Sequence, residues 1–148
     1  MRIWVDGDAM PRPVKEILFR LSDARPIEVV VVANQWLRVP PSRNVRLIVV
    51  GRDFDAADDW VADQVEAGDL VITADIPLAA RVVERGATCL DPRGDVIDAT
   101  NAQSRLAARN LAETVRESGE LTVGPAPFSD RDKHRFAAAL QRLVPRRT

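Results

Sequence analysis

Cysteine and histidine are almost absent from this sequence, and each shortage excludes one kind of site. One cysteine, Cys89, cannot form a disulfide within the chain, and one histidine, His134, cannot complete a Cys/His zinc site. No apolar run approaches the roughly 20 residues that cross a bilayer. The first acid comes as early as Asp6, which is not typical of a signal peptide. We therefore expect a cytoplasmic protein without a membrane segment, whose chemistry would depend mainly on carboxylates.

Aspartate is what the chain has in excess, since 15 of its 22 acidic residues are Asp. The 148 residues, 46% hydrophobic and 29% charged, are typical of one globular domain, which we expect over residues 1–148. The net charge of −1 gives no overall attraction to nucleic acid or membranes. The charge is uneven, however, because residues 1–98 carry −5 and residues 99–148 carry +4.

Apolar runs alternate with segments of helical periodicity along the chain. Such alternation, with runs rich in β-branched residues, predicts an α/β fold with a mostly parallel sheet covered on both faces. The predicted strands are 2–5, 27–33, 45–50, 69–74 and 87–90, with a further β segment at 96–97. The predicted helices begin at Pro11 or Pro13 and then cover 53–66, 76–85, 101–118 and 129–143, with 124–128 separating the last two.

Polar residues follow the predicted strands where each one ends. Asp6 and Asp8 follow the first strand, Asn34 the second, and Asp75 the fourth. Ligands of open α/β sheets bind beyond the carboxyl ends of the strands. If these strands are parallel neighbours, the four side chains share one rim.

The predicted helix 53–66 adds another carboxylate to this set. At 100° per residue, Asp58 lies about 40° from Phe54, on the apolar side of the helix, whereas Asp59 and Asp63 face away. Asp55 lies about 100° from Phe54, on the flank. A carboxylate on an apolar face is costly unless it is paired or binds a metal.

Carboxylates that converge without histidine or cysteine are typical of a site for Mg²⁺ or Mn²⁺. The matching chemistry is hydrolysis of a phosphodiester by a metal-activated water. Structural interpretations remain open for each acid. Asp6 and Asp8 could shape a turn through Gly7, Asp75 and Asp55 could cap helices, and Asp58 could pair with an arginine.

Several motifs resemble the YaiI/YqxD family of uncharacterised bacterial proteins. They are Asp6-Gly-Asp-Ala-Met-Pro11, Val32-Ala-Asn-Gln35, Phe54-Asp-Ala-Ala-Asp-Asp59, Gly68-Asp-Leu-Val-Ile-Thr-Ala-Asp-Ile-Pro-Leu-Ala79, Arg105-Leu-Ala-Ala-Arg109 and Gly124-Pro-Ala-Pro-Phe-Ser-Asp-Arg-Asp132. The resemblance covers nearly the whole chain. The family commonly has Ala and Cys where this chain has Gly7 and Met10, which puts a chemical role for that cysteine in doubt.

That family is similar in turn to PIN-like domains, which are metal-dependent α/β nucleases. The resemblance implies a PIN-like three-layer α/β/α fold with a mostly parallel central sheet. It also implies that Asp6, Asp58 and Asp75 hold the metal, with Asp8 or Asp55 completing the cluster.

The basic C-terminal third contains arginines at roughly one-turn spacing. Arg105, Arg109 and Arg116 could form a helical stripe that contacts phosphates beside the acidic site. The alternative is a solvated face balanced by Glu113 and Glu117.

Other residues in the chain have structural interpretations. Ser129 and Asp132 are expected to start the last helix, Cys89 and Trp4 to lie in the core, and His134 on the surface. Trp36 is the one tryptophan that could stack on a base.

The leading hypothesis is a Mg²⁺- or Mn²⁺-dependent ribonuclease or related phosphodiesterase, with RNA or another phosphodiester as substrate. Asn34 and Thr73 would orient substrate or water, and Arg105 and Arg109 would bind phosphates. One alternative is an aspartyl-nucleophile phosphotransferase using Asp6, for which only Lys15 and Lys133 could supply the usual lysine. Another is a PIN-like module that binds RNA or protein without cutting.

Overall fold

The computed structural model describes every residue except 9, 52, 54, 120–125 and 146–148. Phe54, predicted to lie on the apolar face of its helix, and the first two residues of the predicted linker 124–128 are outside the described part.

Six strands form one sheet in the order β3-β2-β1-β4-β5-β6. The first five pair in parallel and β6 pairs antiparallel with β5, so the prediction of a mostly parallel sheet is confirmed. The strands are β1 (Arg2–Asp6), β2 (Glu28–Ala33), β3 (Val45–Val49), β4 (Leu70–Ile72), β5 (Thr88–Leu90) and β6 (Val96–Ile97).

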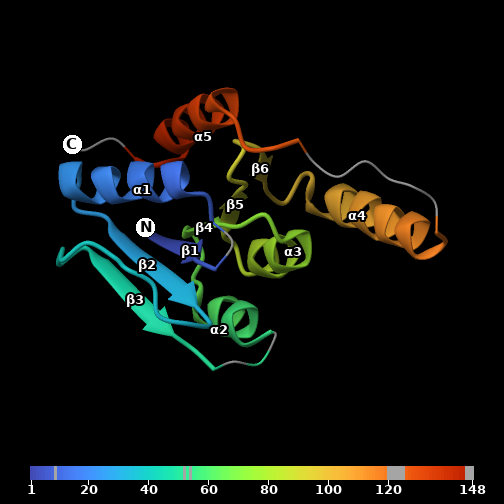
Figure 1. The fold of residues 1–148 in the computed structure, drawn as a ribbon, viewed down its shortest axis with the longest axis horizontal. Coiled ribbons are helices and arrows are strands. Elements are labelled where there is room, and N and C mark those ends of the chain that lie inside the picture. Colours follow the sequence, from blue (N-terminus) through green and yellow to red (C-terminus); the bar gives the residue numbers. More distant parts are fainter. Residues whose placement is uncertain (9, 52, 54, 120–125, 146–148) are drawn as a thin grey trace.

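Helices cover both faces of this sheet, which gives the expected three-layer α/β arrangement. Figure 1 shows α1 and α5 on one side and α2 and α3 on the other. The helices are α1 (Arg12–Ala24), α2 (Ala56–Gln64), α3 (Ile76–Glu84), α4 (Ala102–Glu117) and α5 (Asp130–Leu143). None of the described helices is long and apolar enough to cross a membrane.

The predicted helix boundaries are confirmed where local chemistry sets them. Pro13 lies in the first turn of α1, where its missing N–H is not needed. Ser129 and Asp132 form a reciprocal capping box at the start of α5. Gly86 follows α3 with φ of +90°, a conformation that favours glycine. The helix predicted at 53–66 is shorter, because its first turn starts only after Asp55 and its last ends before Val65.

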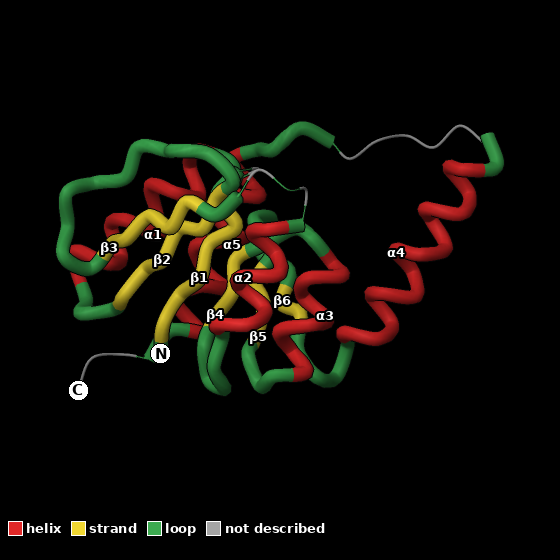
Figure 2. The backbone as a smooth tube through the Cα atoms, turned by 90° about the horizontal axis from the view of Figure 1, so that it is seen from below, coloured by secondary structure: helices red, strands yellow, loops and turns green. Residues whose placement is uncertain are grey.

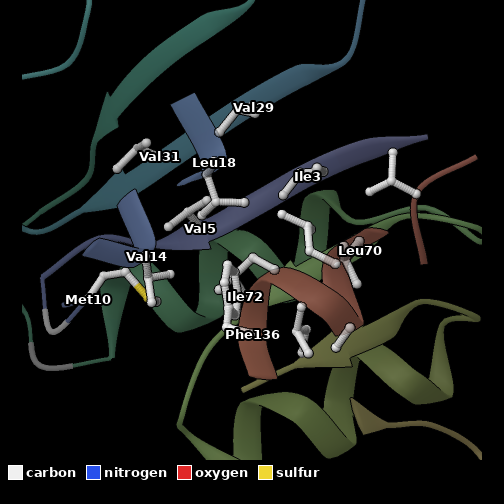
Figure 3. Packing of buried hydrophobic residues seen from close by; sticks show 14 of the residues in the cluster. Ile3, Val5, Met10, Val14, Leu18, Val29, Val31, Leu70, Ile72 and Phe136 are labelled. Carbon is white, nitrogen blue, oxygen red and sulfur yellow. The ribbon is translucent and has the colours of Figure 1, made fainter. Parts of the chain in front are cut away.

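Each face of the sheet has its own apolar cluster. On the α1 and α5 face, Phe136 is fully buried and packs with Leu18 and Ile72 in one cluster, and Figure 3 shows Met10 beside Val14 there. Truncating such an aromatic residue to alanine typically costs about 3–5 kcal/mol. On the other face, Trp4 is 1% exposed, in the same cluster as α2 and α3 residues.

The helix α4 departs from this layered arrangement. It packs against α3 through its first turns, and Ala102 is its one fully buried residue. Figures 1 and 2 both show the rest of α4 projecting away from the sheet. Its side chains are consequently mostly exposed, Leu111 to 66%.

The strand order places a topological switch between β1 and β4. From β1 the chain moves outward to β2 and β3, then returns through α2 to β4 on the other side of β1 and continues to β5. Helices and loops diverge above the carboxyl ends of these two neighbouring strands. This is where open α/β sheets bind their ligands.

Candidate functional site

Asp6 and Asp75 lie together at this switch point. Asp6 is the last residue of β1, and Asp75 follows β4, which pairs with β1 through Val5 and Ile72. Both side chains are half-buried. The prediction that these strand ends share one rim is confirmed, because β1, β2 and β4 are parallel neighbours.

Thr73 connects the Asp6 carboxylate to the backbone of Asp75. It is fully buried, its hydroxyl donates to Asp6 Oδ2 at 3.0 Å, and its Oγ1 accepts from the Asp75 backbone N–H at 3.0 Å. The sequence interpretation gave Thr73 a direct role toward substrate or water. The structure instead engages its hydroxyl within the protein, where it fixes the relative position of Asp6 and Asp75.

Asp75 also caps a helix, as its alternative interpretation predicted. Its Oδ1 accepts from the Leu78 backbone N–H at 3.0 Å, which starts α3. This cap uses one oxygen and directs the carboxyl group over the first turn of α3. The cap therefore orients Asp75 and does not compete with its place in the cluster.

Asp58 reaches the cluster from α2, on the helix face that the sequence predicted. Asp58 is half-buried, whereas Asp59 and Asp63 are exposed. Burial raises the pKa of Asp58 to about 7, and repulsion from Asp75 and Asp6 and a side-chain hydrogen bond with Asp75 add to the rise. The nearby Arg81 pairs with Asp59 at 2.9 Å instead, so the alternative of an Asp58–arginine pair finds no support among the described residues.

The same repulsion acts on Asp6. Burial raises the pKa of this carboxyl, the hydrogen bond from Thr73 opposes the rise, and the Asp75 and Asp8 carboxylates add to it. The carboxyl groups of Asp6, Asp58 and Asp75 are thus close enough to disfavour one another's charge. They come from three separate elements, β1, α2 and the β4–α3 connection.

Asp8 and Asp55 lie at the margin of this cluster. Asp8 is exposed, and its Oδ2 accepts from the Asn34 backbone N–H at 2.8 Å. Asn34 contributes a side-chain Oδ1 that is buried without a hydrogen-bond partner among the described residues. Asp55 occupies the N-cap position of α2 but makes no side-chain cap bond, so its carboxylate is not used to start the helix.

In the described part of the chain, no three side chains of Asp, Glu, His or Cys already form a group able to hold a metal ion. The cluster is a set of oxygen donors, which is the donor type of Mg²⁺ and Mn²⁺.

A cleft of about 620 Å³ opens beside the cluster, between α2, α3 and α4. Acids of α2 and of the β4–α3 connection line it together with arginines of α3 and α4 and with Glu113 of α4. Its lining comprises Asp55, Asp58, Asp59, Ala74, Asp75, Ile76, Pro77, Leu78, Arg81, Arg109, Glu113 and Arg116. This volume lies within the range of small-molecule and cofactor sites.

The structure divides the predicted arginine stripe. Arg109 and Arg116 line the cleft, whereas Arg105 is not part of the lining and contacts Asp95 at 3.6 Å. Sequence reasoning left Arg81 out of the site and gave Glu113 only a balancing role. A helical projection of residues 102–117 groups Arg109, Glu113 and Arg116 on one face, and this signal could have identified the cleft side of α4.

Cys89 and His134 lie where the sequence predicted, in the core and on the surface. Met10, where the family commonly has cysteine, is 8% exposed and packs in the core. Burial raises the pKa of the Cys89 thiol to about 12, which makes it unreactive. His134 is exposed, and Trp36 is 73% exposed in the loop after β2. Gly7 lies between the two first acids in a tight place, since a Cβ there would come within 2.7 Å of Val31.

Known proteins match nearly the whole chain. Residues 4–146 match the YaiI/YqxD family of uncharacterised proteins. A UPF0178 protein of Saccharophagus degradans is 50% identical over 97% of this chain and 95% of its own length. Another of Dechloromonas aromatica is 50% identical over 97% and 96%, and one of Shewanella sp. strain MR-7 is 49% identical over 98% and 95%. No solved structure gives a significant match. The family expected from the motifs is therefore confirmed, and the chain belongs to the YaiI/YqxD family.

Proposed function

We propose that this chain is a PIN-like, Mg²⁺- or Mn²⁺-dependent phosphodiesterase that hydrolyses RNA or a related phosphodiester. The observation that carries the proposal is the convergence of Asp6, Asp58 and Asp75 from three elements at the switch point of the sheet, with arginines across the adjoining cleft. The resemblance of the family to PIN-like domains, which are metal-dependent nucleases, supports the same conclusion.

The donor set fits a hard divalent cation. All its side-chain donors are carboxylate oxygens, the ligands that Mg²⁺ and Mn²⁺ prefer. The cleft is lined by five carboxylates and three arginines, so one divalent cation would balance the difference. When bound, the cation supplies Lewis-acid activation of the phosphodiester and of an attacking water.

Each residue has a separate task in this proposal. Asp6, Asp58 and Asp75 would hold the cation, with Asp8 and Asp55 supporting from the margin. Thr73 keeps Asp6 and Asp75 at a fixed separation through its two hydrogen bonds. Asn34 would orient substrate or water from beside Asp8, whose Oδ2 accepts from the Asn34 backbone N–H. Arg109 would bind a phosphate oxygen on the opposite wall of the cleft.

The direct test is hydrolysis of RNA and of a chromogenic phosphodiester with Mn²⁺ or Mg²⁺ present. We expect Asp58→Asn, Asp6→Asn and Asp75→Asn each to lower kcat/KM at least about 100-fold, the usual scale for losing a group that stabilises the transition state. Asp63→Asn is the matched control, since Asp63 is an exposed carboxylate on the same helix as Asp58 and is not part of the cleft lining. Full activity of Asp58→Asn would contradict the proposal.

A non-catalytic module is the second candidate, favoured by the lack of a preformed metal-ligand group in the described residues. It predicts RNA binding without turnover by any metal-loaded form.

The phosphotransferase alternative has less support. Lys133 lies on α5 beside Ile17 of α1, on the face of the sheet opposite α2. Isolation of a phospho-aspartate at Asp6 would favour it nonetheless.

A further inference from the structure

Arg109, Glu113 and Arg116 form a compact charged group on the projecting helix α4. At 100° per residue, Arg109 and Arg116 differ by about 20° around the helix, and Glu113 lies within about 60° of both. All three line the cleft. They stand on the wall opposite the carboxylates of Asp58 and Asp75.

The two arginines converge on one carboxylate oxygen. Arg109 Nη2 lies 3.4 Å from Glu113 Oε2, and Arg116 Nη2 lies 3.9 Å from the same atom. These are long contacts between side chains that are 40–59% exposed, so each ion pair is weak. Glu113 meets both arginines through one oxygen, whereas an anion that presents a separate free oxygen to each guanidinium group would compete effectively for both.

A phosphate group meets this description. It offers several oxygens to two planar guanidinium groups, which bind phosphate in a bidentate manner. Within the cleft, Glu113 holds the position that such a phosphate would take. A phosphate at this position is separate from one at the Asp6–Asp58–Asp75 cluster, because the carboxylates that line the cleft come from α2 and the β4–α3 connection and the arginines come from α4.

We propose that Arg109, Glu113 and Arg116 form a second phosphate subsite, in which a neighbouring phosphate of the substrate displaces Glu113 from between the two arginines. The inference rests on the proposed function, which places the reacting phosphodiester at the carboxylate cluster. It identifies the substrate as a nucleic acid strand with at least two phosphates, and small diesters with one phosphate as poor ligands.

A purely structural role for the three residues makes a different prediction. Pairs at i,i+3 and i,i+4 spacing stabilise a helix, and removal of either partner would then weaken α4 in the same direction. A phosphate subsite requires that the two kinds of substitution change the affinity for the strand in opposite directions. Loss of an arginine removes a contact to phosphate, whereas loss of the Glu113 charge frees both arginines.

The experiment measures strand affinity of the full chain for Arg116→Ala, Arg109→Ala and Glu113→Gln. The probes are a dodecaribonucleotide and a dinucleoside monophosphate, both with phosphorothioate linkages that resist hydrolysis and both with Mg²⁺ present. For the dodecamer we expect Arg116→Ala and Arg109→Ala to weaken binding about five- to tenfold and to lower the salt dependence by about one charge. Glu113→Gln should strengthen binding about threefold.

Affinity for the dinucleoside monophosphate should stay unchanged in all three variants. Matched controls are Glu117→Gln, an exposed acid of α4 outside the cleft lining, and Arg85→Ala at the far end of α3. The subsite would be overturned if Glu113→Gln and Arg116→Ala changed the affinity for the dodecamer in the same direction. Equal effects on both probes, or no binding of the dodecamer, would also overturn it. If the strand binds as expected and no metal supports hydrolysis, the subsite stands and the phosphodiesterase proposal fails.

Discussion

Aspartates at the two ends of β1 and β4 have opposite surroundings. Asp69, just before β4, is buried and accepts from three N–H groups, those of the Arg2 backbone, the Trp4 indole and the Glu66 backbone, at 3.0–3.1 Å. At the carboxyl ends, Asp6 of β1 and the nearby Asp58 of α2 are half-buried and face other carboxylates. A carboxylate surrounded by donors stabilises the fold, whereas carboxylates that repel one another indicate a place for a cation.

The largest effect on stability is expected for Asp69, at the amino end of β4. Asp69→Asn leaves one carbonyl oxygen for three N–H donors and brings an amide N–H₂ against them. We expect a loss of about 3 kcal/mol in the free energy of unfolding, because buried donors lose a charged acceptor. Urea denaturation measures this loss, and a change below about 0.5 kcal/mol would contradict the role given to Asp69.

Thr73 is the next test, because its hydroxyl links the Asp6 carboxylate to the Asp75 backbone at the carboxyl ends of β1 and β4. Thr73→Val keeps the shape but leaves the Asp75 backbone N–H and Asp6 Oδ2 without this partner. We expect a loss of about 1–2 kcal/mol in stability and about a tenfold fall in kcat. Thr73→Ser retains the hydroxyl and should restore kcat to within a few-fold, which a simple packing role would not predict.

Asp58 should respond to pH in the opposite sense to a structural carboxylate. Its pKa of about 7 in the folded protein exceeds the ordinary value of 3.8, so the folded chain holds more protons between about pH 4 and 7, and its stability falls as pH rises through this window. Asp58 is half-exposed and solvent screens the repulsion. Asp58→Asn should therefore stabilise the protein by only about 1 kcal/mol near pH 8 and by little near pH 4, as measured by urea denaturation across this range. Destabilisation at pH 8 would contradict the account.

Sequence reasoning succeeded where the determining contacts are local. The strand runs, the first turn at Pro13 and the capping box of Ser129 depend on near neighbours in the chain. The inward position of Asp58 follows from the 100° step of a helix. Its approach to Asp75 follows from the parallel sheet and its switch point.

Contacts between distant segments could not be predicted in this way. Two of the three donors to Asp69 come from β1, more than sixty residues away, and periodicity contains no such information. The direction in which α4 leaves the sheet decides that Arg109 and Arg116 line the cleft while Arg105 contacts Asp95. The buried bridge of Thr73 likewise depends on the register between β1 and β4.

The most direct test of the carboxylate cluster as a cation site is calorimetric titration with Mn²⁺ near pH 6.5, just below the pKa of about 7 of Asp58. The wild-type chain and Asp63→Asn should bind the ion with similar affinity and release protons, because binding requires Asp58 to be ionised. Asp58→Asn should weaken binding about 100-fold. Unchanged Mn²⁺ affinity in Asp58→Asn, or no binding by the wild-type chain, would contradict the account.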